Sequence, residues 1–223
     1  MSTDPATPSG HETRSATTRS RLIDAAIEVI SAVGYEGAST RTLARTAHTA
    51  LSAIPYHFGG KKELYLAAAQ MIAEYAANRF VEAVAVLDAD DDMDRAIRFE
   101  QALTDLMHMM LNDVELQTWA PFIARCAYDN DDAFALIYDQ AIAPVLERLV
   151  LTASKLSGRS PDDEVLRLRI SAIATAIISF RFLRGIMLRG LAGNEFHSGS
   201  ISQIEDMIRI LCRSEFLALH HIQ

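Results

Sequence analysis

The chain has 223 residues, half of them apolar, with a formal net charge of −8 at pH 7. The charge is uneven, because residues 1–62 hold seven basic and five acidic residues whereas residues 63–223 hold 14 basic and 24 acidic ones, so only the head is suited to phosphate contact. No apolar run reaches the ~18 to 20 residues that span a bilayer, and the N-terminal segment lacks the apolar core of a signal peptide. We therefore predict a cytoplasmic protein with no membrane partner, and the composition favours a mostly helical fold.

Three helices are predicted near the N-terminus. Residues 1–17 are rich in Ser, Thr and Pro and are predicted to be a disordered arm. Apolar residues then recur at helical spacing from position 18 until Gly34 ends the first helix. Ser39 is the predicted N-cap of a second helix at 40–47, and a third helix over 52–58 ends at the pair 59–60.

A proline stands in the third helix, within the stretch SAIPYHFGGKK at 52–62. Proline in a helix interior costs roughly 3 kcal/mol, but its missing N–H is not needed in the first turn. We therefore predict that Ser52 is the N-cap, which places Pro55 in the first turn.

The rest of the chain is also predicted to be helical. A long helix spans about 61–87, and the acidic run at 88–94 is a predicted loop that lacks the ligand pattern of a calcium site. Further helices are expected at 94–111, 114–128, 131–157, 162–190 and 202–220, and no segment has the pattern of a strand. The predicted fold is all-α, with a three-helix head at 18–64 and a larger helical domain at 65–223.

The head has the pattern of a helix-turn-helix, in which the second of two short helices enters the major groove. Spacing alone fits a small helical subdomain without a ligand equally well. The residues TRTLARTA at 40–47, followed by YHFGGKKELY at 56–65 ahead of a long helix, resemble the TetR family of bacterial repressors. The match covers about 18–66 and includes the family signature YHF-x-x-K-x-x-L. The resemblance implies a homodimer that binds double-stranded, palindromic DNA.

The resemblance also implies the residues that contact DNA. Thr40 meets a phosphate, and Arg41 reaches a guanine edge or a phosphate. Around the third helix, the residues expected to enter the groove are Leu51, Ser52, Ala53 and Tyr56. His57 lies beside the backbone, and Lys61 pairs with a phosphate at the start of the long helix, where helical N–H groups also favour an anion.

The head departs from the family pattern at two places. The turn usually carries Gly, an apolar residue and Ser or Thr, but here has His48, Thr49 and Ala50, and the position before Tyr56 is usually Tyr rather than Pro55. Few side chains can form bidentate base contacts, so specificity would depend on Arg41 and DNA shape. The alternative is a helical bundle that carries a ligand or binds a protein and whose head has lost specific DNA binding.

Within the family, four segments resemble the CecR-like subgroup, namely IPYHFGGKKELYLAAAQ, TWAPFIAR, YDQAIAPVLERL and FRFLRGIMLRGL. This resemblance implies an effector domain and an antibiotic-like ligand. Judged from the residues alone, a stripe of Met and aromatic side chains at helical spacing suits either ordinary core or an apolar pocket. The candidate pocket residues are Met107, Met110, Trp119, Phe122, Tyr138 and Arg181. Arg181 would need a carboxylate or carbonyl partner, from the protein or from an acidic ligand.

The helix at 162–190 is apolar nearly all round, which together with Leu211, Phe216 and Leu217 suits a four-helix dimer interface. Cys126 and Cys212 are expected to be buried, reduced thiols. The sequence has no nucleophile–base pair, phosphate loop or metal set, so no catalysis, cofactor or metal is expected.

Overall fold

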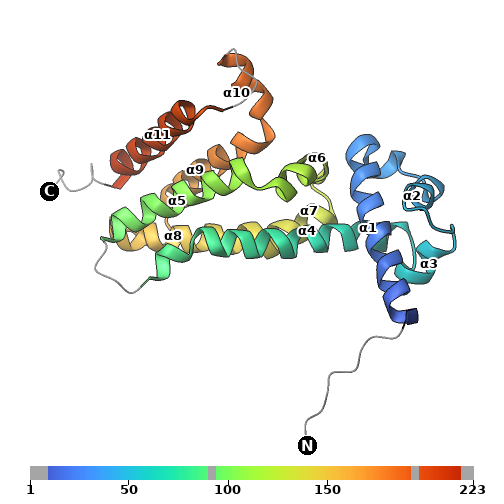
Figure 1. The fold of residues 1–223 in the computed structure, drawn as a ribbon. Helices are drawn as coiled ribbons and strands as arrows, with labels where there is room; N and C mark the ends of the chain where they lie inside the picture. The colour runs from blue at the N-terminus through green and yellow to red at the C-terminus, as the bar shows by residue number, and fades with distance from the viewer. Residues whose placement is uncertain (1–9, 90–93, 192–195, 217–223) are drawn as a thin grey trace, which may run out of the picture. The chain divides into compact units, whose positions relative to one another are not determined.

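The computed structural model describes residues 10–89, 94–191 and 196–216 (Figure 1). Every regular element in these ranges is helical, which confirms the all-α prediction. The α-helices are α1 (Gly10–Gly37), α2 (Thr40–Thr46), α3 (Ala53–Phe58), α4 (Lys61–Ala83), α5 (Arg95–Asn112), α6 (Val114–Asp129), α7 (Asp132–Ile137), α8 (Ala143–Ser157), α9 (Glu164–Phe182), α10 (Arg184–Gly190) and α11 (Ser198–Phe216). A short 3-10 helix (Ala85–Asp88) follows α4, and a π-helical turn (Tyr138–Ile142) precedes α8.

The chain forms two compact units. The first comprises Met1–Ile72 with Pro121–Leu136, and the second comprises Ala73–Ala120 with Ile137–Gln223. Helices α4 and α6 therefore each contribute residues to both units. The sequence pattern did not indicate that 121–136 would join the unit that contains the head.

The first unit is built on the apolar face of α1. Leu22, Ala26 and Ile30 of α1 are almost completely buried, as are Leu43 of α2 and Ile54 of α3. Because α1 contacts both α2 and α3, it braces the two short helices against each other. Their burial fixes the orientation of the opposite, exposed faces of α2 and α3.

Helix α1 begins earlier than predicted. The disorder expected for residues 1–17 is wrong from Gly10 onward, and residues 1–9 lie outside the described ranges. No proline occurs between Pro8 and Thr18, so a helix nucleated by the packed part of α1 can extend backward, and the Thr18 hydroxyl donates to the Arg14 carbonyl. Gly34 breaks the helix as predicted, with φ +77°.

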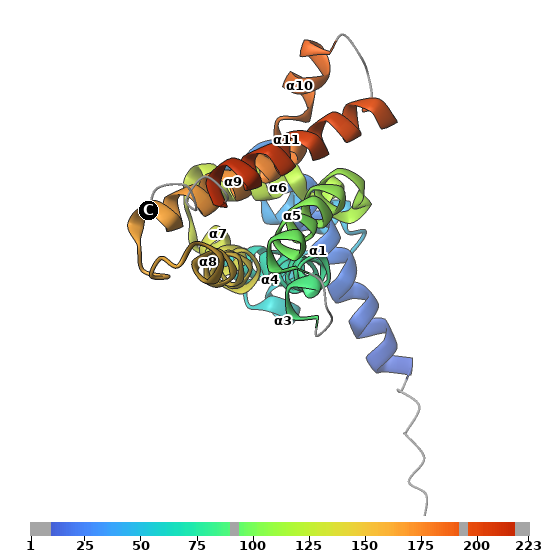
Figure 2. The ribbon, with the colours of Figure 1, turned by 90° about the vertical axis from the view of Figure 1, so that its left-hand side faces the viewer.

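The second unit buries its core between α5 and the helices that surround it. Helix α5 contacts α8, α9 and α11, and α8 also contacts α9. Figure 2 shows α4, α5 and α8 nearly end-on, with α9 and α11 crossing them. Fully buried side chains at the centre include Phe99, Leu103, Met107 and Leu149.

Two helices that were predicted as continuous are interrupted. The segment 131–157 splits at the π-helical turn before α8, where Pro144 lacks the N–H that would continue regular hydrogen bonding. The segment 162–190 breaks at Leu183, and α9 and α10 are bent by 79°. In the described ranges no single helix is long and apolar enough to cross a bilayer, although α9 and α10 together meet that test of length and composition.

Candidate functional site

Helices α2 and α3 form the predicted helix-turn-helix. The Ser39 hydroxyl accepts a hydrogen bond from the Thr42 N–H at 3.1 Å, which confirms Ser39 as the N-cap of α2. After Ala47 the chain turns at His48, whose φ of +51° lies in the left-handed region. This is the position where the family pattern carries glycine, so the turn keeps its backbone geometry with a residue that is strained there.

Replacing His48 with glycine is expected to raise the free energy of unfolding by up to ~1 kcal/mol. A left-handed conformation costs a non-glycine residue ~1–2 kcal/mol, of which the extra backbone freedom of glycine offsets about 0.5–1 kcal/mol. Urea denaturation would measure the change. The control is His48→Ala, which removes the ring but keeps the strain, and an equal gain in that variant would contradict this explanation.

Helix α3 begins as predicted. Ser52 precedes its first residue, and Pro55 lies in the first turn, where no intrahelical N–H bond is lost. The first helical hydrogen bond runs from the Tyr56 N–H to the Ser52 carbonyl at 3.2 Å. The Ser52 side chain makes no capping bond, so the predicted position of the cap is confirmed but side-chain capping is not found.

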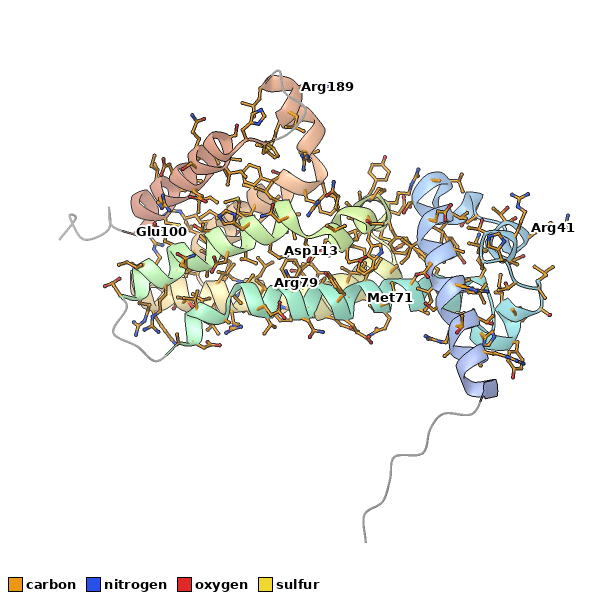
Figure 3. All side chains as sticks on the ribbon, in the orientation of Figure 1. Arg41, Met71, Arg79, Glu100, Asp113 and Arg189 are labelled. Atoms are coloured by element: carbon orange, nitrogen blue, oxygen red, sulfur yellow. The ribbon has the colours of Figure 1, made fainter. Side chains whose placement is uncertain are left out.

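Most of the residues predicted to contact DNA reach the surface of the first unit. Tyr56 is 75% exposed and Leu51 50% exposed, while Ile54 between them is buried and anchors α3. Thr40, Arg41 and Ser52 are exposed, and Ala53, His57 and Lys61 are partly exposed. Arg41 projects outward from the head (Figure 3). The exposed side chains therefore combine aromatic, hydroxyl and cationic groups from α2, α3 and the start of α4.

Two cations of the head rest on aromatic rings, which the sequence pattern did not indicate. The Lys61 ammonium lies 4.1 Å from the centre of the Tyr35 ring, and the Arg19 guanidinium lies 5.1 Å from that of Phe58. Such contacts contribute about 0.5–1 kcal/mol at exposed sites. They fix the Arg19 charge beside the end of α3 and the Lys61 charge at the start of α4, where Lys61 is predicted to pair with a phosphate.

Helix α6 contributes a polar cluster to the first unit. Arg125 donates to the Ser31 and Ala32 carbonyls at 2.8 and 3.0 Å, near the break in α1. The Tyr65 hydroxyl donates to Asp131 at 2.7 Å and lies 3.0 Å from the Cys126 sulfur. Burial, reinforced by these two partners, raises the pKa of Tyr65. The cluster ties α6 and the following turn to α1 and α4.

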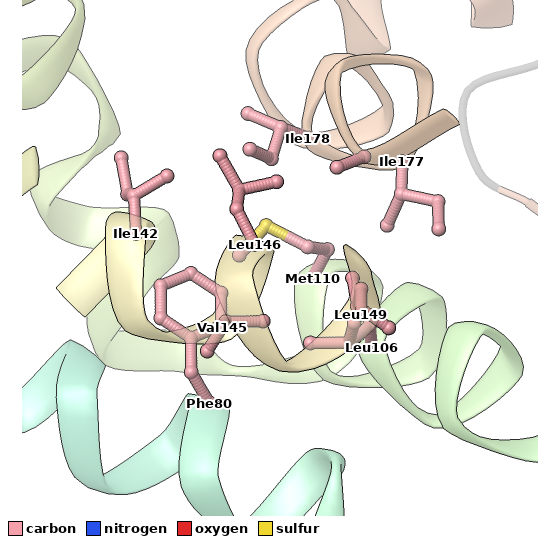
Figure 4. Close-up of a pocket in the computed structure, with 10 residues that line it drawn as sticks. Phe80, Leu106, Met110, Ile142, Val145, Leu146, Leu149, Ile177 and Ile178 are labelled. Atoms are coloured by element: carbon pink, nitrogen blue, oxygen red, sulfur yellow. The ribbon is translucent and has the colours of Figure 1, made fainter. Parts of the chain in front are cut away.

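The second unit contains an apolar cavity with about 350 Å³ of empty space, part of it open to solvent (Figure 4). Its wall is entirely apolar and comes from α4, α5, the π-helical turn, α8 and α9. The lining residues are Phe80, Leu106, Met110, Ile142, Val145, Leu146, Leu149, Ala174, Ile177 and Ile178. The part that a water-sized sphere can occupy is only about 30 Å³, far below the ~300–1,000 Å³ typical of ligand pockets, so an effector would have to widen the cavity by moving the side chains that line it.

The structure does not bring the predicted pocket residues together. Of that set only Met110 lines the cavity, and Met107 is buried in the core beside it. Phe122 belongs to the first unit, where its ring lies 5.4 Å from that of Tyr65. Trp119 packs edge-on against Tyr75, and Tyr138 is 40% exposed. The cavity is lined mainly by branched aliphatic side chains, which composition cannot distinguish from ordinary core.

A buried polar network lies in the second unit, centred on Asp113. Its carboxylate accepts from Arg79 Nε at 2.9 Å, the Tyr75 hydroxyl at 3.0 Å and the Leu116 N–H at 2.9 Å. Burial by itself raises the pKa of Asp113, but these three hydrogen bonds outweigh it and hold the pKa below its ordinary value. The Asp113 main-chain oxygen accepts from Arg181 at 2.7 Å.

Other polar residues have structural partners. His108 lies 2.7 Å from Glu205, so it is a partly buried histidine with a protein partner. Burial raises the pKa of Cys126 to about 11 and of Cys212 to about 12, and both thiols are free. Across residues 10–89, 94–191 and 196–216, no three His, Cys, Asp or Glu side chains are placed to hold a metal ion.

Comparison with protein families gives two matches that together span most of the chain. Residues 22–68 match the model described as bacterial regulatory proteins, tetR family. Residues 96–219, more than half of the chain, match the model described as the C-terminal domain of the HTH-type transcriptional dual regulator CecR.

Individual proteins give a consistent result. The chain is 30% identical over 168 residues to the HTH-type transcriptional dual regulator CecR of Shigella flexneri, covering 73% of this chain and 75% of that protein. It is 28% identical over 181 residues to the HTH-type transcriptional repressor AcnR of Corynebacterium efficiens, covering 78% and 86%. Among solved structures, a TetR-like transcriptional regulator from Rhodococcus sp. RHA1 has a TM-score of 0.55 at 20% identity, covering 88% and 94% of the two chains. The hemolysin II regulator HlyIIR has a TM-score of 0.55 at 17% identity, covering 90% and 97%.

Proposed function

Because the chain belongs to the TetR family of bacterial transcriptional regulators, and within it to the CecR-like type, we propose that it represses transcription in the cytoplasm until an effector releases it from DNA. The operator is palindromic double-stranded DNA bound by a homodimer. The effector is a small hydrophobic or amphipathic, antibiotic-like molecule. No catalytic step is part of this proposal.

The observation that carries the DNA-binding proposal is the exposed face of α3. Tyr56 is three-quarters exposed in a helix whose opposite side is anchored by Ile54. An aromatic hydroxyl and the flanking Arg41 and Lys61 suit contact with phosphates and base edges in a major groove. Leu51 and Ala53 offer apolar contact with thymine methyl groups.

The observation that supports an effector is the apolar cavity between α5, α8 and α9. Its lining has no polar atoms, so the bound part of a ligand would be held by burial of apolar surface. A ligand releases the protein from DNA only if it binds the DNA-incompetent state more tightly than the DNA-bound one. We propose that filling this cavity favours such a state.

Dimer formation is supported by apolar side chains left uncovered on the last helices. Exposed examples are Leu168 on α9, Ile186 on α10 and Ile210 on α11, each at least 66% exposed. Leu211 is 37% exposed, while Leu217 and the side chain of Phe216 lie outside the described part of the chain. A two-fold dimer would cover this surface and present two heads to successive half-sites.

The proposal is tested by selecting bound sequences from a random DNA pool, with and without candidate apolar ligands. Enrichment of a palindrome that the ligand releases is the expected result. No enrichment would instead support a ligand-carrying or protein-binding bundle whose head has lost specific DNA binding. A palindrome enriched only in the presence of ligand would replace the repressor by a ligand-dependent binder.

A further inference from the structure

Arg181 is a buried cation with spare hydrogen-bonding capacity. Its side chain lies on α9 and the residue is only 7% exposed. Among the described residues, its one hydrogen-bond acceptor is the main-chain oxygen of Asp113 at 2.7 Å, and Nε has no partner. The Asp113 carboxylate is already bound to Arg79 and Tyr75. A guanidinium has five N–H donors, so most of those of Arg181 remain free to bind a ligand.

The position of Arg181 relates it to the apolar cavity. Ile177 and Ile178 line the cavity, and Arg181 follows them by four and three positions, on the same face of α9. Side chains of a helix lean toward its N-terminus, so Arg181 leans toward the turn that lines the cavity. On α5, Met110 lines the cavity and Asp113 follows by three positions. The Cα of Arg181 therefore lies about one helical turn, ~5 Å along the helix axis, beyond the cavity lining.

A buried arginine bound only to a carbonyl is costly to folding, and an anion would relieve that cost. Burial lowers the pKa of Arg181, the nearby Asp113 carboxylate offsets part of that effect, and the positive charge of Arg184 lowers the pKa further. The fork of a guanidinium matches the two oxygens of a carboxylate. The local chemistry thus favours a carboxylate-bearing ligand over a neutral or cationic one.

We propose that the effector is a small organic acid whose apolar body fills the cavity and whose carboxylate pairs with Arg181. The inference rests on the proposed function, because it takes the cavity as the effector site. It adds the chemical class of the ligand and the residue that recognises it.

The test compares octanoate, 1-octanol and octylamine, which share one apolar chain and differ in charge. Binding to the full-length protein is measured by calorimetry and by release of the selected operator. Octanoate is expected to bind roughly tenfold or more tightly than 1-octanol, as for a hydrogen bond to a charged group, and octylamine more weakly than either.

Arg181→Met tests the residue itself. This variant is expected to lose the preference for octanoate while 1-octanol binding stays within about twofold, since methionine keeps an apolar side chain of similar length. Its midpoint of thermal unfolding without ligand is expected to be unchanged or raised, because a buried unpaired cation is removed. If Arg181→Met does not fold, Arg181→Lys keeps the charge without the fork and should reduce, but not abolish, the preference.

Ala174→Phe is the matched control, because it fills the cavity without touching the cation. It should weaken octanoate and 1-octanol alike. Equal binding of octanoate and 1-octanol to the wild type, with loss of both in Ala174→Phe, would overturn the acid preference and leave the proposed function in place. Absence of binding by any of the three probes would overturn both the inference and the cavity as effector site.

Discussion

Replacing Asp113 with alanine is expected to lower the free energy of unfolding by about 3 kcal/mol, the low end for breaking a buried charged pair. The residue is 8% exposed and its carboxylate is shared by Arg79, Tyr75 and the Leu116 N–H. Its removal leaves those donors without their acceptor at the junction of α5 and α6. Arg79 is partly exposed, so water can solvate its guanidinium once the carboxylate is gone. The expected loss in free energy of unfolding is therefore at the low end of the range.

The control for this prediction is Glu82→Ala, which removes the other acid that pairs with Arg79. Glu82 is 63% exposed, so its removal should change the free energy of unfolding by less than about 1 kcal/mol. Urea denaturation measures both variants. Equal effects would mean that the burial of Asp113 is not what makes the network important.

The same carboxylate gives a pH dependence with a defined sign. The pKa of Asp113 is depressed in the folded state, so its contribution to stability is fully present above about pH 4, the ordinary pKa of aspartate. It is lost as the pH falls through the lower, folded-state pKa. Stability measured from pH 7 to pH 2 should therefore fall less steeply below pH 4 in Asp113→Asn than in the wild type.

Simultaneous replacement of Arg41, Tyr56 and Lys61 by alanine is expected to weaken operator binding at least ~100-fold, since a base-edge pairing contributes about 1–3 kcal/mol. The slope of log affinity against log salt should also fall by about 0.9 for each phosphate that the variant no longer neutralises. Fluorescence anisotropy at several salt concentrations measures both quantities. Unchanged binding would refute the proposed contacts.

A matched control removes two positive charges from the second unit instead. Arg159 and Arg167 pair with Asp163 and Glu147 there and have no proposed contact with DNA. Their double alanine variant should bind the operator within about twofold of the wild type, because each arginine is already paired with a carboxylate and neither has a proposed phosphate contact. Lys61→Ala also removes the cation that rests on the Tyr35 ring, so thermal unfolding should accompany the DNA measurements.

The sequence was most informative where local chemistry determines structure. Ser39, Gly34 and the placement of Pro55 follow from capping and backbone rules that act within a few residues, and the structure confirms them. The start of α1 was harder to predict from the sequence, because a helix can extend through polar residues once its apolar part is packed.

The sequence was least informative where distant segments meet. No proline marks the bend at Leu183, and the helical spacing of apolar residues is the same on both sides of it, so the sequence pattern does not reveal the bend. The cavity is lined mainly by isoleucine, leucine and valine, whose pattern is that of any buried helix face. The sequence analysis instead selected the more distinctive Trp119 and Phe122, which do not line the cavity. Of the predicted pocket residues, Met110 lines the cavity, and Arg181, expected to need a partner, lies on the α9 face that continues from it.

The two cysteines provide built-in reporters of local opening, one in each unit. Cys126 is completely buried in the first unit and Cys212 is 5% exposed in the second, and burial makes the thiolate form of both scarce at neutral pH. Alkylation of either thiol therefore requires a transient exposure of its surroundings. Mass spectrometry of the two peptides would follow the opening of each unit separately in the unmodified chain, with operator or effector added in turn.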